Sequence, residues 1–199
     1  MRILHVSDMH CRTDLLLKVL EEEEYDIAIA SGDFECVDTA QAFARAVKGR
    51  GYAVTGNLDD PSVARTLREH GVLIDGTLVE FEGLKIGGVG GIDVAGSLEA
   101  LERRLKERKV DVLVSHHPPK GILDRTFFRL RIGLREIGWL VEKLNPRVHL
   151  FGHVHESRGV EERGGVLFVN AGPLKSGHYA VIECDSGLEN CRAELRRLS

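Results

Sequence analysis

Short apolar runs alternate with amphipathic segments through the first third of the chain. Runs with the length and composition of buried strands lie at residues 2–7, 26–30 and 52–55. Apolar side chains at helical spacing follow them over residues 13–23, 38–48 and 61–69, the last segment starting at a proline. This β-α-β-α-β order predicts a parallel sheet whose strands are joined by crossover helices.

The pattern becomes more irregular after residue 70. Further strands are expected at residues 72–74, 78–81, 84–89, 110–115 and 147–151, with helices at 98–108 and 134–144. The C-terminal segment predicts antiparallel strands at residues 158–162, 166–169, 178–184 and 191–196. A turn at Gly164-Gly165 joins the first two of these. No linker or repeat interrupts the pattern, so a single domain over residues 1–199 is predicted.

The composition narrows the class of protein. Hydrophobic residues make up 43% of the chain, charged residues 29%, and the net charge is −4, a balance typical of globular domains. This charge gives no indication of a nucleic-acid-binding surface, and no apolar stretch is long enough for a membrane span or a signal peptide. We therefore expect a cytoplasmic protein without membrane contact. Reduced thiols are expected for its four cysteines, Cys11, Cys36, Cys184 and Cys191.

Side chains able to bind metals follow the C-terminal ends of the predicted strands. They are Asp8, His10, Asp33, Asn57, His116, His153 and His155. Because ligand sites of open α/β sheets lie at that edge, we expect these residues to converge. Seven oxygen and imidazole ligands are too many for one tetrahedral ion and favour two ions that share a carboxylate. Taken alone, the final pair also fits polar loop histidines, so the prediction depends on the whole set.

The set resembles a known family when it is taken in order. Asp8-x-His10, Gly32-Asp33, Gly56-Asn57, His116 and Gly152-His153-x-His155 are similar to the motifs of the calcineurin-like metallophosphoesterases, as is Asn170-Ala171-Gly172-Pro173. The resemblance spans essentially the whole chain and is strongest to small bacterial and archaeal phosphodiesterase-like members. It implies an α/β fold, a four-layer αββα sandwich of two mixed β-sheets flanked by helices.

The resemblance also implies a dinuclear metal centre. Asp8, His10 and His155 would hold one divalent ion, Asn57, His116 and His153 the other, and Asp33 would bridge both. Manganese is favoured among manganese, iron, zinc, cobalt and nickel, all of which accept such ligands. The expected reaction is the hydrolysis of a phosphate ester by a metal-activated hydroxide. Asp33 keeps the ions close, and Asn57 is a neutral ligand that leaves the site positive.

One position departs from the family pattern. Many members have a histidine directly after the asparagine, where this chain has Leu58. Leucine cannot transfer a proton, and loss of a general acid costs on the order of 10²–10⁴ in rate. His117 is a candidate to contact substrate in its place, although a role in orienting its neighbours is equally open. We therefore expect hydrolysis of phosphodiesters or activated esters rather than broad monoesterase activity.

The surroundings of the site leave the substrate and the partners open. Arg12 is expected to be a solvated arginine at a helix start. The segment 127–131, Phe-Phe-Arg-Leu-Arg, either forms a lip that stacks on a nucleotide or, as favoured, packs its phenylalanines on the body. A small-molecule phosphate ester or a nucleotide is the expected substrate, and the oligomeric state is not indicated. The rival hypothesis is an interaction scaffold, because one retromer subunit resembles this family with a degenerate site; the complete ligand set favours an enzyme.

Overall fold

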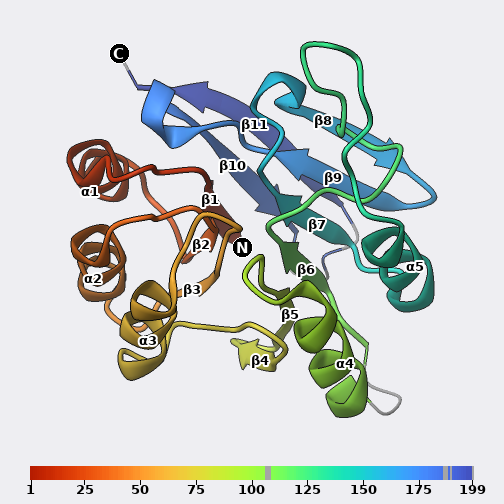
Figure 1. Cartoon of the computed structure of the whole chain (residues 1–199), viewed down its shortest axis with the longest axis horizontal. Helices are drawn as coiled ribbons and strands as arrows, with labels where there is room; N and C mark the ends of the chain where they lie inside the picture. Colours follow the sequence, from red (N-terminus) through yellow and green to blue (C-terminus); the bar gives the residue numbers. More distant parts are fainter. Residues whose placement is uncertain (106–108, 186–187, 189, 199) are drawn as a thin grey trace.

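Two β-sheets pack face to face, and helices cover both outer faces (Figure 1). The structure is a computed structural model that describes residues 1–105, 109–185, 188 and 190–198. Both sheets contain parallel and antiparallel pairs of strands. The four-layer sandwich of two mixed sheets implied by the resemblance is therefore confirmed.

The first sheet has five strands in the order β11-β10-β1-β2-β3. Their bounds are Arg2–Val6 for β1, Ile27–Ser31 for β2, Gly51–Val54 for β3, His178–Cys184 for β10 and Cys191–Arg197 for β11. Strand β1 lies at the centre, parallel to β2 and antiparallel to β10. Strands from both ends of the chain thus build this sheet.

Three helices cover the outer face of the first sheet. They are α1 (Thr13–Glu22), α2 (Val37–Ala46) and α3 (Pro61–Glu69). Helix α1 turns Leu16, Val19 and Leu20 inward, in agreement with its apolar spacing. Helix α3 starts where the Asp60 carboxylate accepts hydrogen bonds from the backbone N–H groups of residues 62 and 63.

The second sheet has six strands in the order β4-β5-β6-β7-β9-β8. Their bounds are Leu78–Phe81 for β4, Leu84–Val89 for β5, Val112–Ser115 for β6, Val148–Phe151 for β7, Gly159–Arg163 for β8 and Val166–Asn170 for β9. Helices α4 (Val94–Leu105) and α5 (Arg135–Leu144) pack on its outer face. Buried apolar side chains from both sheets, such as Ile29, Ile86 and Leu150, fill the space between them.

Most predicted elements are present within one or two residues of their expected ends. The strand predicted at 72–74 is wrong, because that segment makes only an isolated bridge from Leu73 to Ala53 of β3. Helix α4 begins four residues before its predicted start, and the predicted residues 106–108 lie outside the described part. Strand β9 pairs antiparallel with β8 as expected, and also parallel with β7.

The expectation of reduced cysteines is also wrong. The structure joins Cys11 to Cys36 and Cys184 to Cys191. Neither pair has Cys-x-x-Cys spacing, because the partners are 25 and 7 residues apart. The Cα atoms of Cys11 and Cys36 lie 5.1 Å apart, within the range of a disulfide. Among the described residues, no helix has both the length and the apolar character needed to cross a membrane. The cytoplasmic location stays a prediction.

Candidate metal centre

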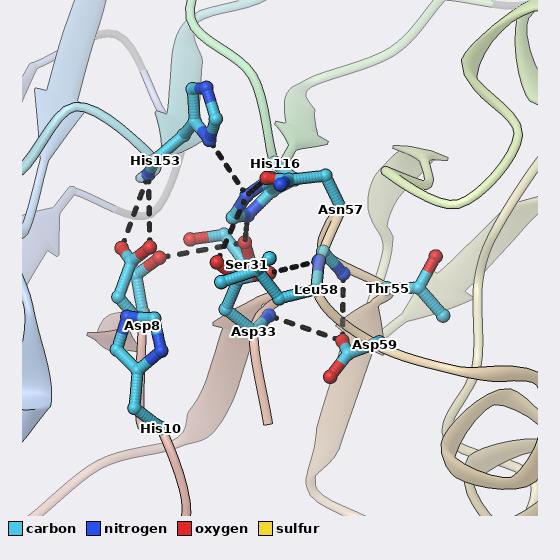
Figure 2. A network of polar contacts seen from close by, with 12 residues as sticks. Asp8, His10, Ser31, Asp33, Thr55, Asn57, Leu58, Asp59, His116 and His153 are labelled. Carbon is cyan, nitrogen blue, oxygen red and sulfur yellow. Dashed lines mark hydrogen bonds and ion pairs between the residues drawn. The ribbon is translucent and has the colours of Figure 1, made fainter. Parts of the chain in front are cut away.

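The structure brings all seven predicted ligands together at one rim of the sandwich (Figure 2). The loops after β1, β2 and β3 carry Asp8 and His10, Asp33, and Asn57, and the loops after β6 and β7 carry the remaining three histidines. The site therefore lies where the two sheets meet. The role of these residues as ligands stays a prediction.

The loops that carry the site are held in an uncommon backbone conformation. Four of the seven residues, Asp8, His10, Asp33 and His153, have φ between 45° and 69°. Non-glycine residues in this left-handed region cost about 1–3 kcal/mol each, so the surrounding contacts must impose it. Two backbone hydrogen bonds of 3.0 Å do so between the first two loops, from Asp8 N–H to the Gly32 carbonyl and from His10 N–H to the Asp33 carbonyl.

One group of candidate ligand atoms comes from Asp8, His10 and His155, all within 4.8 Å of one another. Nε2 of His155 lies 3.2 Å from Oδ1 of Asp8 and 3.4 Å from Nε2 of His10. His10 donates its Nδ1–H to the Glu35 carboxylate at 2.7 Å. In the neutral tautomer of His10, Nε2 is therefore the unprotonated nitrogen, and it faces the other two ligands.

The second group contains Asp8, Asp33 and His116, again within 4.8 Å. Nε2 of His116 lies 2.8 Å from Oδ1 of Asn57 and 3.5 Å from Oδ2 of Asp33. Nδ1 of His153 lies 3.2 Å from the same nitrogen. Asp8 belongs to both groups and Asp33 to the second, and the bridging role expected of Asp33 stays a prediction.

The donor set fits divalent cations on its own chemistry. His116 donates its Nδ1–H to the Ser31 carbonyl at 2.8 Å, so its Nε2 presents a lone pair to the Asn57 oxygen. Nε2 of His10 lies 3.4 Å from Nε2 of His155, which in turn forms a hydrogen bond with the Asp8 carboxylate. Acceptor atoms that point at one another repel unless a proton or a cation lies between them, and carboxylate, amide and imidazole groups are ligands for the first-row transition metals.

Glu35 was not predicted as part of the site. It orients His10 through the 2.7 Å hydrogen bond, a carboxylate–histidine pair of the kind that fixes the tautomer of a metal ligand. The only signal in the sequence is its place two residues after Asp33, which says nothing about the direction of its side chain. The Ser31 carbonyl orients His116 through a backbone atom, so the sequence gives no indication of this contact.

Asp59 organises the backbone under the site (Figure 2). Its carboxylate accepts hydrogen bonds from the backbone N–H groups of Asp33 (3.1 Å), Glu35 (2.7 Å) and Gly56 (2.8 Å). Burial raises the pKa of this carboxyl to about 6, against the effect of these hydrogen bonds. Asp59 thus ties the loop after β2 to the loop after β3, which explains the acidic residue two positions after Asn57.

Burial and neighbouring charge shift the pKa values of the site. Burial opposes ionisation of Asp8, but the hydrogen bond with His155 and the nearby His116 hold its pKa well below the usual range. Burial, with a contribution from His116, lowers the pKa of His153 to about 4 and that of His117 to about 3. These two imidazoles are therefore neutral near pH 7, as metal ligation requires of His153.

Two glycines allow the loops to approach this closely. A Cβ at Gly152 would overlap the side chains of Ser7 and Asp8, and a Cβ at Gly56 would overlap Asp33. Any larger residue at either position would displace a candidate ligand. The glycines of the Gly56-Asn57 and Gly152-His153 motifs are thus explained by close packing against carboxylates.

The other predicted residues surround this centre. The His117 ring lies 4.5 Å from the His153 ring and 5.2 Å from the His116 ring, centroid to centroid, so it borders the second group. Leu58 is 54% exposed at the rim. Arg12 is exposed and forms an ion pair with Asp14, as a solvated helix-start arginine would. The favoured packing of Phe127 and Phe128 on the body is wrong, because both side chains are 80% exposed.

Comparisons with known proteins identify the same family as the motifs. Residues 1–187 match the model of the calcineurin-like phosphoesterase superfamily domain. Human metallophosphoesterase domain-containing protein 1 is 42% identical over 64 residues, which are 31% of this chain and 20% of that protein. The matched stretch thus spans about a fifth of that curated relative.

Solved structures show the same fold across whole chains. The protein TT1561 of Thermus thermophilus superposes with a TM-score of 0.68 at 20% identity, covering 97% of both chains. Vps29 of Entamoeba histolytica, solved in complex with Zn²⁺, superposes with a TM-score of 0.55 at 13% identity, covering 99% of both. At these identities the likeness concerns the fold alone.

Proposed function

The chain belongs to the calcineurin-like phosphoesterase superfamily, and on that premise we propose that it is a metal-dependent phosphodiesterase acting on small-molecule or nucleotide esters. The observation that carries the proposal is the convergence of candidate ligand atoms at the rim. Nε2 of His116 faces the Asn57 oxygen at 2.8 Å, and Nε2 of His10 faces Nε2 of His155 at 3.4 Å. A complete donor set of this kind favours catalysis over a purely structural role.

Two divalent cations, with manganese favoured, would be held at these groups. Asp8, His10 and His155 would hold one, Asn57, His116 and His153 the other, and Asp33 would contact both. When bound, the cations would neutralise the charge of the ester and bring the pKa of water to about 7. The neutral Asn57 amide adds no negative charge, so the site retains an attraction for an anionic substrate.

The remaining side chains fix the position of the reacting groups. Oδ1 of Asp33 accepts the Leu58 backbone N–H at 3.0 Å, which leaves Oδ2 directed at His116. His117, half-buried beside His153, would donate a hydrogen bond to a substrate oxygen as a neutral imidazole. With a pKa near 3 it is a poor source of a full proton near pH 7.

The preference for diesters follows from the missing proton donor. Leu58 occupies the rim position where many family members have a histidine, and its exposed side chain cannot protonate a departing alkoxide. Esters with good leaving groups need no such proton. A diester also carries one negative charge, whereas a monoester dianion carries two. The lower charge suits this rim, because Leu58 is uncharged and His117 is neutral beside the substrate.

The test compares two substrates with the same leaving group. The manganese-loaded protein is expected to hydrolyse bis-p-nitrophenyl phosphate faster than p-nitrophenyl phosphate, and EDTA should abolish both rates. Asp33→Asn should reduce the diester rate by at least 100-fold, whereas Asp38→Asn, an exposed carboxylate at the start of α2, should retain the parent rate. Parent-like turnover by Asp33→Asn would exclude the mechanism.

The alternative is an interaction scaffold with little or no activity. Its support is the replacement of the histidine at Leu58 together with the likeness in fold to Vps29. The two hypotheses differ in one cheap measurement. A scaffold would bind no substrate and would show no metal-stimulated hydrolysis of the activated diester at any divalent metal tested.

A further inference from the structure

A hairpin with an apolar tip projects beside the candidate metal centre. Its arms pair through an antiparallel bridge between Arg125 and Arg131, and its turn is closed by a hydrogen bond from Thr126 N–H to the Leu130 carbonyl at 3.0 Å. Phe127 and Phe128 are each 80% exposed and Leu130 is 63% exposed. Exposed phenylalanines adjacent to each other indicate a binding surface, because single exposed apolar residues are common but clusters are not.

The base of this hairpin is fixed to the body. The buried carboxylate of Asp124 binds the Arg131 guanidinium at 2.9 Å and accepts the Gly121 N–H at 2.8 Å. The two phenyl rings contact each other edge to face, with centroids 5.6 Å apart. The tip is therefore presented on an ordered support, which lowers the entropy cost of binding a ligand there.

The hairpin is also attached to the segment that carries a candidate ligand. Ser157 accepts the Arg125 N–H at 3.0 Å and donates its hydroxyl to the Arg125 carbonyl at 2.7 Å. Glu156 accepts the Phe127 N–H at 3.3 Å. Both partners belong to the 3₁₀ turn His155–Ser157, whose first residue is the predicted ligand. The hairpin is thus joined directly to the segment that carries this candidate ligand.

The charge of the hairpin complements an anion. Arg131 is neutralised by Asp124, but neither Arg125 nor Arg129 forms an ion pair within the described part of the chain. Both guanidinium groups are exposed. A ligand with a planar aromatic part and an anionic part would satisfy the phenyl rings and these cations together, since aromatic rings stack and arginine binds phosphate.

We propose that residues 125–131 are the specificity element of the enzyme and bind the aromatic part of a phosphodiester, a nucleobase being the biological example. One phenylalanine stacks on the ring and the other contacts its edge, and Arg125 and Arg129 attract the attached phosphate toward the metal centre. This inference rests on the proposed phosphodiesterase function. It assigns the selection of substrate to a hairpin that contributes no metal ligand.

The experiment uses two diesters with one leaving group, the p-nitrophenyl esters of thymidine 5′-phosphate and of ethyl phosphate. Phe127→Ser/Phe128→Ser should lower kcat/KM for the thymidine ester by about 10- to 100-fold, because stacking of one base has that worth. The ethyl ester should change by less than about 2-fold. Trp139→Ser, which removes an exposed aromatic residue from α5, should leave both values unchanged.

The outcomes separate this inference from the function on which it rests. Absence of metal-stimulated hydrolysis of both esters by the parent would remove the phosphodiesterase function and the inference with it. Hydrolysis with an equal loss for both esters, or with no loss for either, would overturn the inference alone. So would co-flotation of the parent, but not the double variant, with anionic phosphatidylserine vesicles, because the tip would then be a membrane-binding element.

Discussion

The Nε2 atom of His116 lies 2.8 Å from the Oδ1 atom of Asn57, and the only imidazole proton of a neutral His116 is donated to the Ser31 carbonyl. A histidine from the second sheet and an amide from the first sheet thus direct acceptor atoms at the same point. Nε2 of His10 and Nε2 of His155 also approach each other, at 3.4 Å. Each of these two close contacts marks a candidate position for one cation, so counting the bound ions tests the metal centre.

The first prediction concerns the number of bound ions. His116→Gln should reduce the manganese bound per chain from two to one, because the second group loses its central imidazole while His10 and His155 are unchanged. Equilibrium dialysis followed by elemental analysis measures the stoichiometry. His70→Gln, at the exposed end of α3, should retain two ions. Two ions bound to His116→Gln with parent affinity would contradict the assignment.

The second prediction concerns Glu35. Glu35→Gln keeps the shape of the side chain but replaces the charged acceptor of the His10 Nδ1–H with a neutral one. The affinity for the more weakly bound manganese ion should fall by about 10- to 100-fold, the usual effect of removing such a supporting carboxylate. Titration calorimetry is the measurement, with Glu21→Gln on the surface of α1 as the matched control. An unchanged affinity would show that Glu35 does not orient His10.

The third prediction compares the two disulfides. Cys11 directly follows His10 and Cys36 directly follows Glu35, so this bridge joins the two segments that meet in the hydrogen bond at the site. Cys11→Ser/Cys36→Ser should lower both the unfolding free energy, by about 2–4 kcal/mol, and the affinity for manganese.

The second bridge supplies the control for the first. Cys184→Ser/Cys191→Ser removes the cross-strand bridge between β10 and β11 and should lower stability without changing the affinity for manganese. Chemical denaturation and metal titration of the two double variants separate these effects. Equal losses of metal affinity in both would mean that the first bridge stabilises only the fold.

The fourth prediction concerns acid stability. Burial lowers the pKa of His149 to about 3, from 6.5. The folded state therefore binds a proton at His149 less readily than the unfolded state does. Above pH 6.5 this difference has no effect on the unfolding free energy. As the pH falls from 6.5 toward 3, it lowers the unfolding free energy by about 1.4 kcal/mol per pH unit. His149→Gln should therefore lose less unfolding free energy between pH 7 and 4.5 than the parent, by about 2–3 kcal/mol.

Urea denaturation in EDTA at several pH values measures this difference. EDTA removes the contribution of bound metal, and the ligand histidines are common to both proteins. His70→Gln, at the exposed C-terminal end of α3, should follow the parent curve. Parallel curves for His149→Gln and the parent would show that the buried imidazole has no part in acid unfolding. The Ser115 hydroxyl, which contacts His149 at 2.9 Å, remains available to the glutamine amide.

The sequence predicted what depends on local periodicity and motif order. The apolar spacing located the helices at Thr13–Glu22 and Pro61–Glu69 almost to the residue. The strand ends located all seven candidate ligands, because parallel strands deliver their carboxyl ends to one rim. The pairing between strands distant in sequence could not be predicted in the same way. The parallel pairing of β9 with β7, for example, is not specified by the side-chain pattern of either strand.

What could not be predicted depends on three-dimensional contact. The direction of the Glu35 side chain follows from a left-handed backbone, with φ of 59°, in a non-glycine residue. The pairing of Cys11 with Cys36 follows from the approach of two loops. The exposure of Phe127 and Phe128 contradicts their apolar character; the contacts of Asp124 and Ser157 fix the base of the hairpin and leave its tip in solvent. The single domain over 1–199 stays a prediction.

The position of β1 in the centre of its sheet has a consequence for the timing of metal acquisition during synthesis. One neighbour of β1 is β10, near the other end of the chain, and the Ser7 and Asp8 carbonyls accept hydrogen bonds from the backbone of residues 174 and 175. A ribosome must therefore release residues through His178–Cys184 before the Asp8 loop has its full support. Nascent chains should remain metal-free until that moment, so that loading with cations follows the synthesis of β10.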